Sequence, residues 1–192
     1  MPIFVDHDRR RQEVAKIAYD LIAKGGTDAA SIRNVADAAG YSTTIVSHYF
    51  ASKRELLQVT YDLSVERGSS LLMKTALRGD LQKTFEIFLP TTPNQKKNWR
   101  VWLAFRVASL ADKEIAKQQR VMGYRARDWM KDLIKQSSTA ARKLSEPELH
   151  ELARLTLSHL IGIAVQASFD PLDWTIGDQK KAVADLINRL IR

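Results

Sequence analysis

The sequence contains no cysteine. This absence excludes disulfide bonds, thiolate zinc sites and cysteine nucleophiles, and it suits a reducing compartment. The N-terminal segment lacks the long apolar run of a signal peptide, and no stretch of about 18 consecutive apolar residues is present to span a membrane. The sequence therefore predicts a cytoplasmic protein without a membrane partner.

The short motifs of common enzymes are also missing. There is no glycine-rich phosphate loop and no nucleophile elbow. His150 and Glu151 begin like a zinc-protease box, but Arg154 stands where the second histidine of that box belongs. We therefore expect no enzymatic activity, no metal site and no cofactor.

Acidic residues are too few to balance the basic ones. The chain carries 30 lysines and arginines against 22 aspartates and glutamates, and its net charge of +8 favours a polyanionic partner. Residues 1–55 are nearly neutral, with eight basic and seven acidic residues, whereas residues 96–143 hold thirteen basic and four acidic ones. Net charge thus supports nucleic-acid binding only loosely. The basic segment is interpreted as a solvated face, with contact to DNA phosphate or to an anionic ligand as the alternative.

The sequence shows no strand pattern, repeat or low-complexity segment, and apolar residues recur at helical spacing throughout. Serine N-caps and glycine stops set the helix ends, and Ser52 with Glu55 and Ser145 with Glu148 have the spacing of capping boxes. About nine helices are predicted, over residues 8–24, 31–40, 42–49, 52–77, 80–89, 96–110, 113–143, 145–169 and 177–191. This pattern predicts an all-α fold, with a three-helix head over residues 1–55 and a helical body over residues 56–192.

Two short helices separated by Gly40 and Tyr41 predict a helix-turn-helix, a motif whose second helix enters the major groove of DNA. Gly40 permits the left-handed backbone that a tight turn needs. The second helix is rich in short polar side chains and aromatic donors, which reach phosphates and base edges. Lys53 adds a positive charge at the start of the next helix, where helix N-terminal amides also favour phosphate.

Residues 31–57 have the sequence SIRNVADAAGYSTTIVSHYFASKRELL. From Ile-x-x-Val-Ala to Phe-x-x-Lys-x-x-Leu-Leu, this segment resembles the DNA-binding signature of the TetR/AcrR family of bacterial transcriptional regulators. The run Ile-Val-Ser-His-Tyr-Phe, and more weakly the segment 102–109, are similar to the BetI-like branch, the betaine-pathway repressors that respond to choline. The resemblance implies a homodimer that represses transcription from a palindromic DNA operator and that a small-molecule effector releases.

The resemblance also implies which residues contact DNA. They cap the first helix of the motif, face the groove from the second helix, or bind phosphate beside it. The implied DNA-binding residues are Ser31, Arg33, Ser42, Thr43, Thr44, Ser47, His48, Tyr49 and Lys53. Most family members carry tyrosine where this sequence has Ser47.

The body is expected to hold the ligand, because it is longer than the task of joining two heads requires. Large apolar side chains and a few polar ones at helical spacing either line a pocket or form an ordinary core. The candidates are Phe88, Trp99, Trp102, Phe105, Arg106, Met122, Tyr124, Trp129, His159 and Gln166. A quaternary ammonium ligand needs an aromatic cage, and the helix before the last has no aromatic residue near its middle, so the effector is not identified.

The last two long helices carry more apolar positions than one helix pair can bury, which favours a four-helix interface between two copies. The predicted interface residues are Leu152, Leu160, Ile163, Ala164, Ala167, Leu186, Leu190 and Ile191. Two alternatives stay open for the function: a helix-turn-helix protein without ligand control, and an activator instead of a repressor.

Overall fold

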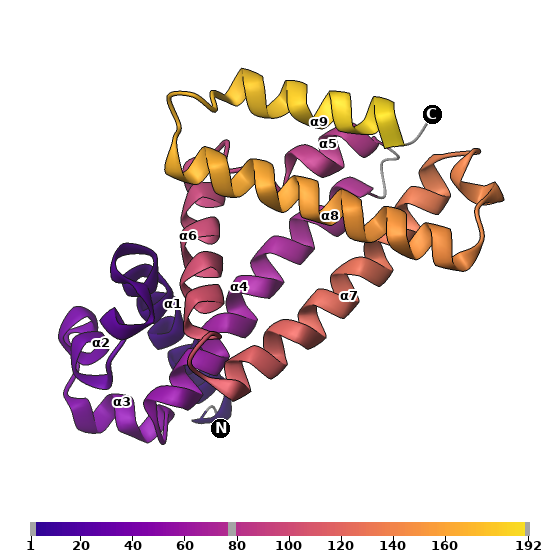
Figure 1. Cartoon of the computed structure of the whole chain (residues 1–192). Coiled ribbons are helices and arrows are strands. Elements are labelled where there is room, and N and C mark those ends of the chain that lie inside the picture. Colours follow the sequence, from indigo (N-terminus) through magenta and orange to yellow (C-terminus); the bar gives the residue numbers. More distant parts are fainter. Residues whose placement is uncertain (1–2, 77–79, 191–192) are drawn as a thin grey trace. The chain divides into compact units, whose positions relative to one another are not determined.

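Helices make up the regular structure of this chain, as its sequence predicts. The computed structural model describes residues 3–76 and 80–190, without the side chains of residues 3–6, 70, 71 and 190. Over those residues it has nine α-helices, one short 3-10 helix and no strand (Figure 1). The elements are α1 (Ile3–Ala29), α2 (Ile32–Ala39), α3 (Thr43–Tyr49), α4 (Lys53–Ala76), α5 (Leu81–Glu86), α6 (Pro93–Ala108), α7 (Lys113–Ser137), η1 (Ala141–Lys143), α8 (Glu146–Phe169) and α9 (Ile176–Leu190).

The caps predicted around the helix-turn-helix are confirmed. The Ser31 hydroxyl accepts a hydrogen bond from the Asn34 N–H at 3.1 Å, and the Ser42 hydroxyl accepts one from the Ile45 N–H at 3.3 Å. Gly40 ends α2 in the left-handed region, with φ of 67°. Each short helix therefore begins and ends where its own sequence dictates.

Several helix ends differ from the prediction. α1 extends from Ile3 to Ala29 instead of over residues 8–24, and Gly25 and Gly26 form a kink with non-helical backbone inside it. Two further differences have a clear physical reason. α6 begins at Pro93 instead of Lys96, because a capping box forms there: the Gln95 N–H donates to Thr92 Oγ1 at 3.2 Å, and the Thr92 N–H donates to Gln95 Oε1 at 2.9 Å. α7 ends at Ser137, before Lys143. Arg142 turns back to cap it, donating to the carbonyl oxygen of residue 135 at 3.2 Å and to that of residue 136 at 2.9 Å.

The chain divides into two compact units, which are described separately. One contains residues 1–69 and 100–112, and the other contains residues 70–99 and 113–192. The division falls at other positions than the predicted boundary between residues 55 and 56. The predicted boundary separates the DNA-binding part from the ligand-binding and dimerisation part, and this division of functions stays a prediction.

In the first unit, α1, α2 and α3 pack on one another. Val14, Ala18 and Ile22 of α1 are buried, as are Val35 of α2 and Val46 of α3. Burial of one apolar face leaves the opposite faces of α2 and α3 to solvent, and these faces are polar. The hydrophobic effect thus sets which side of α3 points outward.

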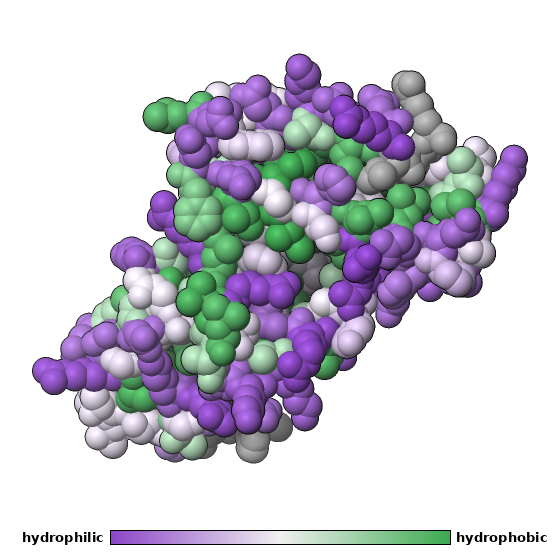
Figure 2. Space-filling model, viewed as in Figure 1, coloured by the Kyte–Doolittle hydropathy of each residue, from purple (hydrophilic) through white to green (hydrophobic). Residues whose placement is uncertain are grey.

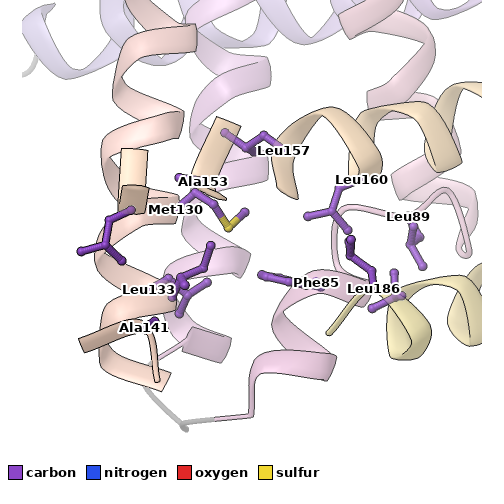
Figure 3. Packing of buried hydrophobic residues seen from close by; sticks show 12 residues of the cluster. Phe85, Leu89, Met130, Leu133, Ala141, Ala153, Leu157, Leu160 and Leu186 are labelled. Atoms are coloured by element: carbon purple, nitrogen blue, oxygen red, sulfur yellow. The ribbon is translucent and has the colours of Figure 1, made fainter. Parts of the chain in front are cut away.

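The second unit has a core built from α5, α7, α8 and α9 (Figure 3). Phe85 of α5, Met130 of α7, Leu160 of α8 and Leu186 of α9 belong to this core. Phe85, Met130 and Leu160 have no accessible surface. The last two long helices therefore bury part of their apolar residues within one chain.

This burial revises the predicted dimer contacts. A side chain without accessible surface in a single chain adds no contact area with a partner. Leu160 and Ala164 are fully buried, and Ala167 and Leu186 nearly so. Leu152 and Ile163 are partly buried against the same core, while the Leu190 side chain and Ile191 lie outside the described residues.

α8 also exposes two large apolar side chains, Leu155 at 41% and Phe169 at 76%, among polar ones. Among the described helices it alone is long and apolar enough, by length and composition, to cross a membrane, a test that core helices of soluble proteins also pass. Seven of its residues are buried within the single chain. Its outer apolar side chains are thus the ones left to be covered.

We predict that Gly40→Ala destabilises the protein by about 1–2 kcal/mol, because an L-residue with a side chain resists the left-handed region. Gly40→Asn should cost less, since asparagine tolerates that region better. Gly123→Ala is the matched control: Gly123 lies inside α7 with no atom within 4 Å of an added Cβ, so alanine should stabilise the helix. Urea unfolding followed by circular dichroism measures all three, and equal effects at positions 40 and 123 would contradict the turn assignment.

Candidate nucleic-acid interface

α3 presents a polar outer surface on a buried support. Val46 is fully buried, whereas Thr43, Thr44, Ser47 and His48 are exposed. Short hydroxyl side chains and an imidazole ring donate and accept hydrogen bonds, as recognition of base edges requires. The structure thus brings the predicted groove-facing residues together on one side of one short helix.

The capping residues have part of their hydrogen-bonding capacity in use. Ser31 and Ser42 accept backbone N–H bonds through their hydroxyl oxygens. A hydroxyl that accepts a bond still has its proton to donate, so both side chains remain able to contact a phosphate. Arg33 on α2 is 85% exposed, and the Asp37 carboxylate with which it pairs is 4.0 Å away. Its guanidinium is therefore available to a nucleic acid at little cost.

Three rings from two helices meet at the end of α3. His7 of α1 lies 5.0 Å from Tyr49 and 5.7 Å from His48, measured between ring centroids, and His48 lies 5.5 Å from Tyr49. The contact places the beginning of α1 beside the predicted contact residues. His7 was not among those residues, because 41 positions separate it from His48 in the sequence.

Lys53 has an intramolecular partner. Its Nζ donates to Asp28 Oδ1 at 2.8 Å, and the Asp28 side chain is 97% exposed. This hydrogen bond, together with the charge of Lys53, lowers the pKa of the Asp28 carboxyl from its ordinary value. Exposed ion pairs of this kind are weak, so a phosphate can replace Asp28 as the partner of Lys53.

Ile45 is an apolar surface residue that was not among the predicted contacts. Adjacent residues of a helix point about 100° apart, so Ile45 and its neighbour Val46 face different ways. Val46 is buried and Ile45 is 43% exposed. An exposed apolar side chain on a recognition helix suits contact with a thymine methyl group.

A single carboxylate fixes α3 relative to its neighbours. Glu55 Oε2 accepts from the Ala51 N–H at 2.8 Å, and Glu55 Oε1 accepts from Arg11 of α1 at 2.5 Å. The expected capping box is therefore only half formed: Ser52 accepts from the Glu55 N–H at 3.2 Å, but Glu55 bonds to Ala51 instead of the Ser52 N–H. The turn between α3 and α4 is tied to α1 as a result.

Three of the predicted ligand residues belong to the first unit. Phe105 is buried and packs edge-on against Tyr61, with ring centroids 5.0 Å apart. The Arg106 guanidinium lies over the Trp102 ring, 4.4 Å from its centroid. Trp102 therefore stacks on a cation within this unit, whereas Phe105 belongs to the buried interior.

The other predicted ligand residues belong to the second unit and do not form one group. Phe88 and Trp129 lie 6.3 Å apart and pack on the core, and the Trp99 indole donates to the Phe88 carbonyl oxygen. Met122 is partly buried, and the exposed side chains are Tyr124, His159 and Gln166. A surface depression of about 360 Å³ is lined by Asp132, Lys135, Gln136 and Arg142, none of which was predicted. The ligand-binding assignment stays a prediction.

Two family profiles match the chain, one after the other. Residues 16–60 match the profile of bacterial regulatory proteins of the tetR family, and residues 77–192 match the C-terminal profile of BetI-type transcriptional repressors. The HTH-type transcriptional regulator PksA of Bacillus subtilis is 34% identical over 110 residues, which are 55% of this chain and 54% of that protein. The match thus spans about half the length of PksA. The regulator BetI of Vibrio atlanticus is 27% identical over 173 residues, covering 85% of this chain and 82% of that protein.

Solved structures with the same fold are also regulators. A transcriptional regulator from Rhodococcus has a TM-score of 0.81 at 22% identity, over 94% of this chain and 95% of that one. A regulator from Saccharomonospora viridis, solved in complex with choline, has a TM-score of 0.84 at 19% identity, over 96% of this chain and 98% of that one. These identities are low, so the structural likeness concerns the fold alone.

We predict that Lys53→Gln weakens binding to DNA of any sequence and lowers the salt slope of the affinity by about one unit, because one phosphate contact is lost. Thr44→Ala and His48→Ala should instead change which bases are preferred. Lys181→Gln, which removes the same charge from α9, is the matched control and should leave the slope unchanged. Fluorescence anisotropy at several salt concentrations measures the effect. Full affinity and unchanged base preference in a Thr44/His48/Tyr49 triple alanine variant would contradict the assignment.

Proposed function

Because this chain belongs to the tetR family of bacterial regulatory proteins, with a BetI-type region at its C-terminal end, we propose that it is a repressor that a small molecule releases from a palindromic operator. The chain is a DNA-binding transcriptional regulator with a helix-turn-helix. Ligand release, the direction of regulation and the residues involved form the proposal. The alternatives are an activator and a regulator without ligand control.

The observation that carries the proposal is the exposed polar face of α3 on its buried apolar support. Thr43, Thr44, Ser47 and His48 are exposed on a helix whose Val46 is fully buried. The polar side chains on the exposed face of α3 do not pack in the core. They are therefore available to contact base edges. We assign direct readout of bases to this face, and phosphate contacts to Ser31, Tyr49 and Lys53.

A second copy of this chain is proposed to cover the outer face of α8. Leu155, His159, Gly162, Gln166 and Phe169 are exposed and follow one another at spacings of four and three, the heptad spacing of helices that pair. Phe169 is 76% exposed. Hydrophobic side chains gather along α8 in Figure 2, with polar ones on both sides. Homodimers are typical of the family, and a palindromic site requires two-fold symmetry.

We predict that Gly162→Leu abolishes the dimer at micromolar concentration. No atom of the chain lies within 4 Å of a Cβ added at Gly162, so leucine leaves the single chain undisturbed but blocks close approach of a second helix. Sedimentation velocity measures the change, and Phe169→Glu should give the same result. Leu110→Glu, at a position that is 87% exposed outside α8, should remain dimeric. A wild-type monomer, or dimers of both α8 variants, would sink the α8 interface.

Regulators of this family are generally not enzymes, and we expect no catalytic activity in this chain. We place it in the cytoplasm, where operator DNA is found. Choline is one candidate effector, because a structural neighbour was solved in complex with it and because an aromatic ring such as that of Trp129 suits a quaternary ammonium. The Arg106 guanidinium lies over the Trp102 ring. Its positive charge would repel choline from that ring, because choline is also a cation.

The operator and the release can be tested together. Random DNA duplexes selected on the purified protein should converge on an inverted repeat, which footprinting then locates. A small-molecule panel is next added to the complex, and the effector should lower operator affinity about 5–150-fold, the usual range of coupling between sites. Selection of an inverted repeat that no compound releases would favour the ligand-independent alternative. A failure to select any sequence would contradict the proposed repressor.

A further inference from the structure

Buried N–H groups of this chain lack hydrogen-bond acceptors. Among the described residues, four buried side-chain polar atoms have no partner, and three of them are donors: Arg106 Nε, Gln119 Nε2 and Arg127 Nε. A buried donor without an acceptor destabilises the folded protein, so such groups are rare unless a ligand or a water satisfies them. Water or a ligand that supplies acceptor atoms would satisfy these donors.

Arg106 is the most informative of the three because its charge is partly buried. Burial lowers the pKa of its guanidinium from the ordinary value, and arginine remains protonated nonetheless. The guanidinium lies over the Trp102 ring, 4.4 Å from its centroid. Burial raises the pKa of Tyr61, and the positive charge of Arg106 acts on that pKa in the opposite direction. A partly buried cation in aromatic surroundings is costly unless an anion joins it.

The chain supplies no such anion among its described residues. No carboxylate is paired with Arg106, although the same unit holds several. Asp112 lies 3.7 Å from Arg54 and Asp62 accepts from Gln58 at 3.1 Å, so both have other partners. Arg106 is thus a cation held in place by a ring and left without a counter-charge.

The second unit repeats this chemistry on α7. Gln119, Gly123 and Arg127 are spaced by four residues and so share one face of the helix. Gln119 is only 5% exposed, yet its amide nitrogen has no acceptor. No atom lies within 4 Å of a Cβ added at Gly123. On this face of α7, an unpartnered donor thus lies four residues on either side of Gly123.

We propose that the effector carries an anionic oxygen group, a carboxylate or a phosphate, on an apolar body, and that Arg106 binds this group. The inference rests on the proposed ligand control. A guanidinium donates two parallel hydrogen bonds to such groups, and stacking on Trp102 fixes the plane in which it does so. A quaternary ammonium such as choline meets like charge at Arg106 and satisfies none of the unpartnered donors.

The test compares anionic probes with neutral and cationic ones. Phenylacetate, decanoate and phenyl phosphate are the anions, phenylacetamide and decanol are neutral counterparts of the two carboxylates, and choline is the cation. Binding to the DNA-free protein is followed by tryptophan fluorescence and by thermal shift. We expect at least one anion to bind about tenfold or more tightly than its neutral counterpart, the loss typical when a charged hydrogen bond is absent. Carboxylate and phosphate probes together tell which of the two groups is recognised.

Variants then assign the effect to the residue. Arg106→Met should remove the preference for the anion, and Arg106→Lys should keep part of it. Arg125→Met, an exposed arginine on α7, is the control and should bind like the wild type. If Arg106→Met does not fold, the wild-type ratio of phenylacetate to phenylacetamide affinity and the Arg106→Lys titration decide the question.

Three results would overturn the inference: no anion binds, neutral counterparts bind equally well, or choline binds more tightly than every anion. Operator affinity without any probe is measured in parallel on the wild type and Arg106→Met. If the wild type does not bind an operator at all, the result counts instead against the proposed repressor. The two failures are therefore distinguishable.

Discussion

The carboxylate of Glu55 is the contact on which the geometry of the helix-turn-helix depends. One oxygen caps the turn after α3 through the Ala51 N–H, and the other binds Arg11 of α1. A buried apolar contact such as that of Val46 fixes the depth of α3 but allows rotation about its axis. Hydrogen bonds to both oxygens of one carboxylate are directional, so they restrict that rotation. Recognition of bases needs both constraints, because side chains must meet base edges within a fraction of an ångström.

The sequence predicted these local features because their causes are local. Ser31, Ser42 and Gly40 act on backbone groups within four residues, and such signals are legible in the chain. The start of α6 had an equally local signal, Thr92 followed by Pro93 and Gln95, but two prolines close together made the segment resemble a loop. The end of α7 was not predictable in the same way. Its cap comes from Arg142, which acts backwards from beyond the helix on two carbonyl oxygens.

The candidate site was predictable as a motif but not as a set of contacts. Position in the helix-turn-helix identified Thr44, His48 and Lys53, whereas the pairing of Lys53 with Asp28 joins residues 25 positions apart. The two faces of α8 show a further limit. Periodicity predicts that Leu160 and Gly162 lie on different faces, but it does not tell which face meets the chain's own core. Packing decides this, and it buries Leu160 while leaving Gly162 exposed.

Arg106 connects the proposed ligand binding with the proposed DNA binding, because it lies in the same compact unit as the helix-turn-helix. Residues 100–112 of α6 and the following turn belong to the same compact unit as α1, α2 and α3. A ligand anion at Arg106 would act beside Tyr61 of α4, the helix whose first turn Glu55 ties to α1. A ligand shifts an equilibrium only by its difference in affinity for two arrangements. An ion pair between the anion and Arg106 would supply such a difference. An arrangement of the helices in which this ion pair forms binds the ligand more tightly than an arrangement in which it does not.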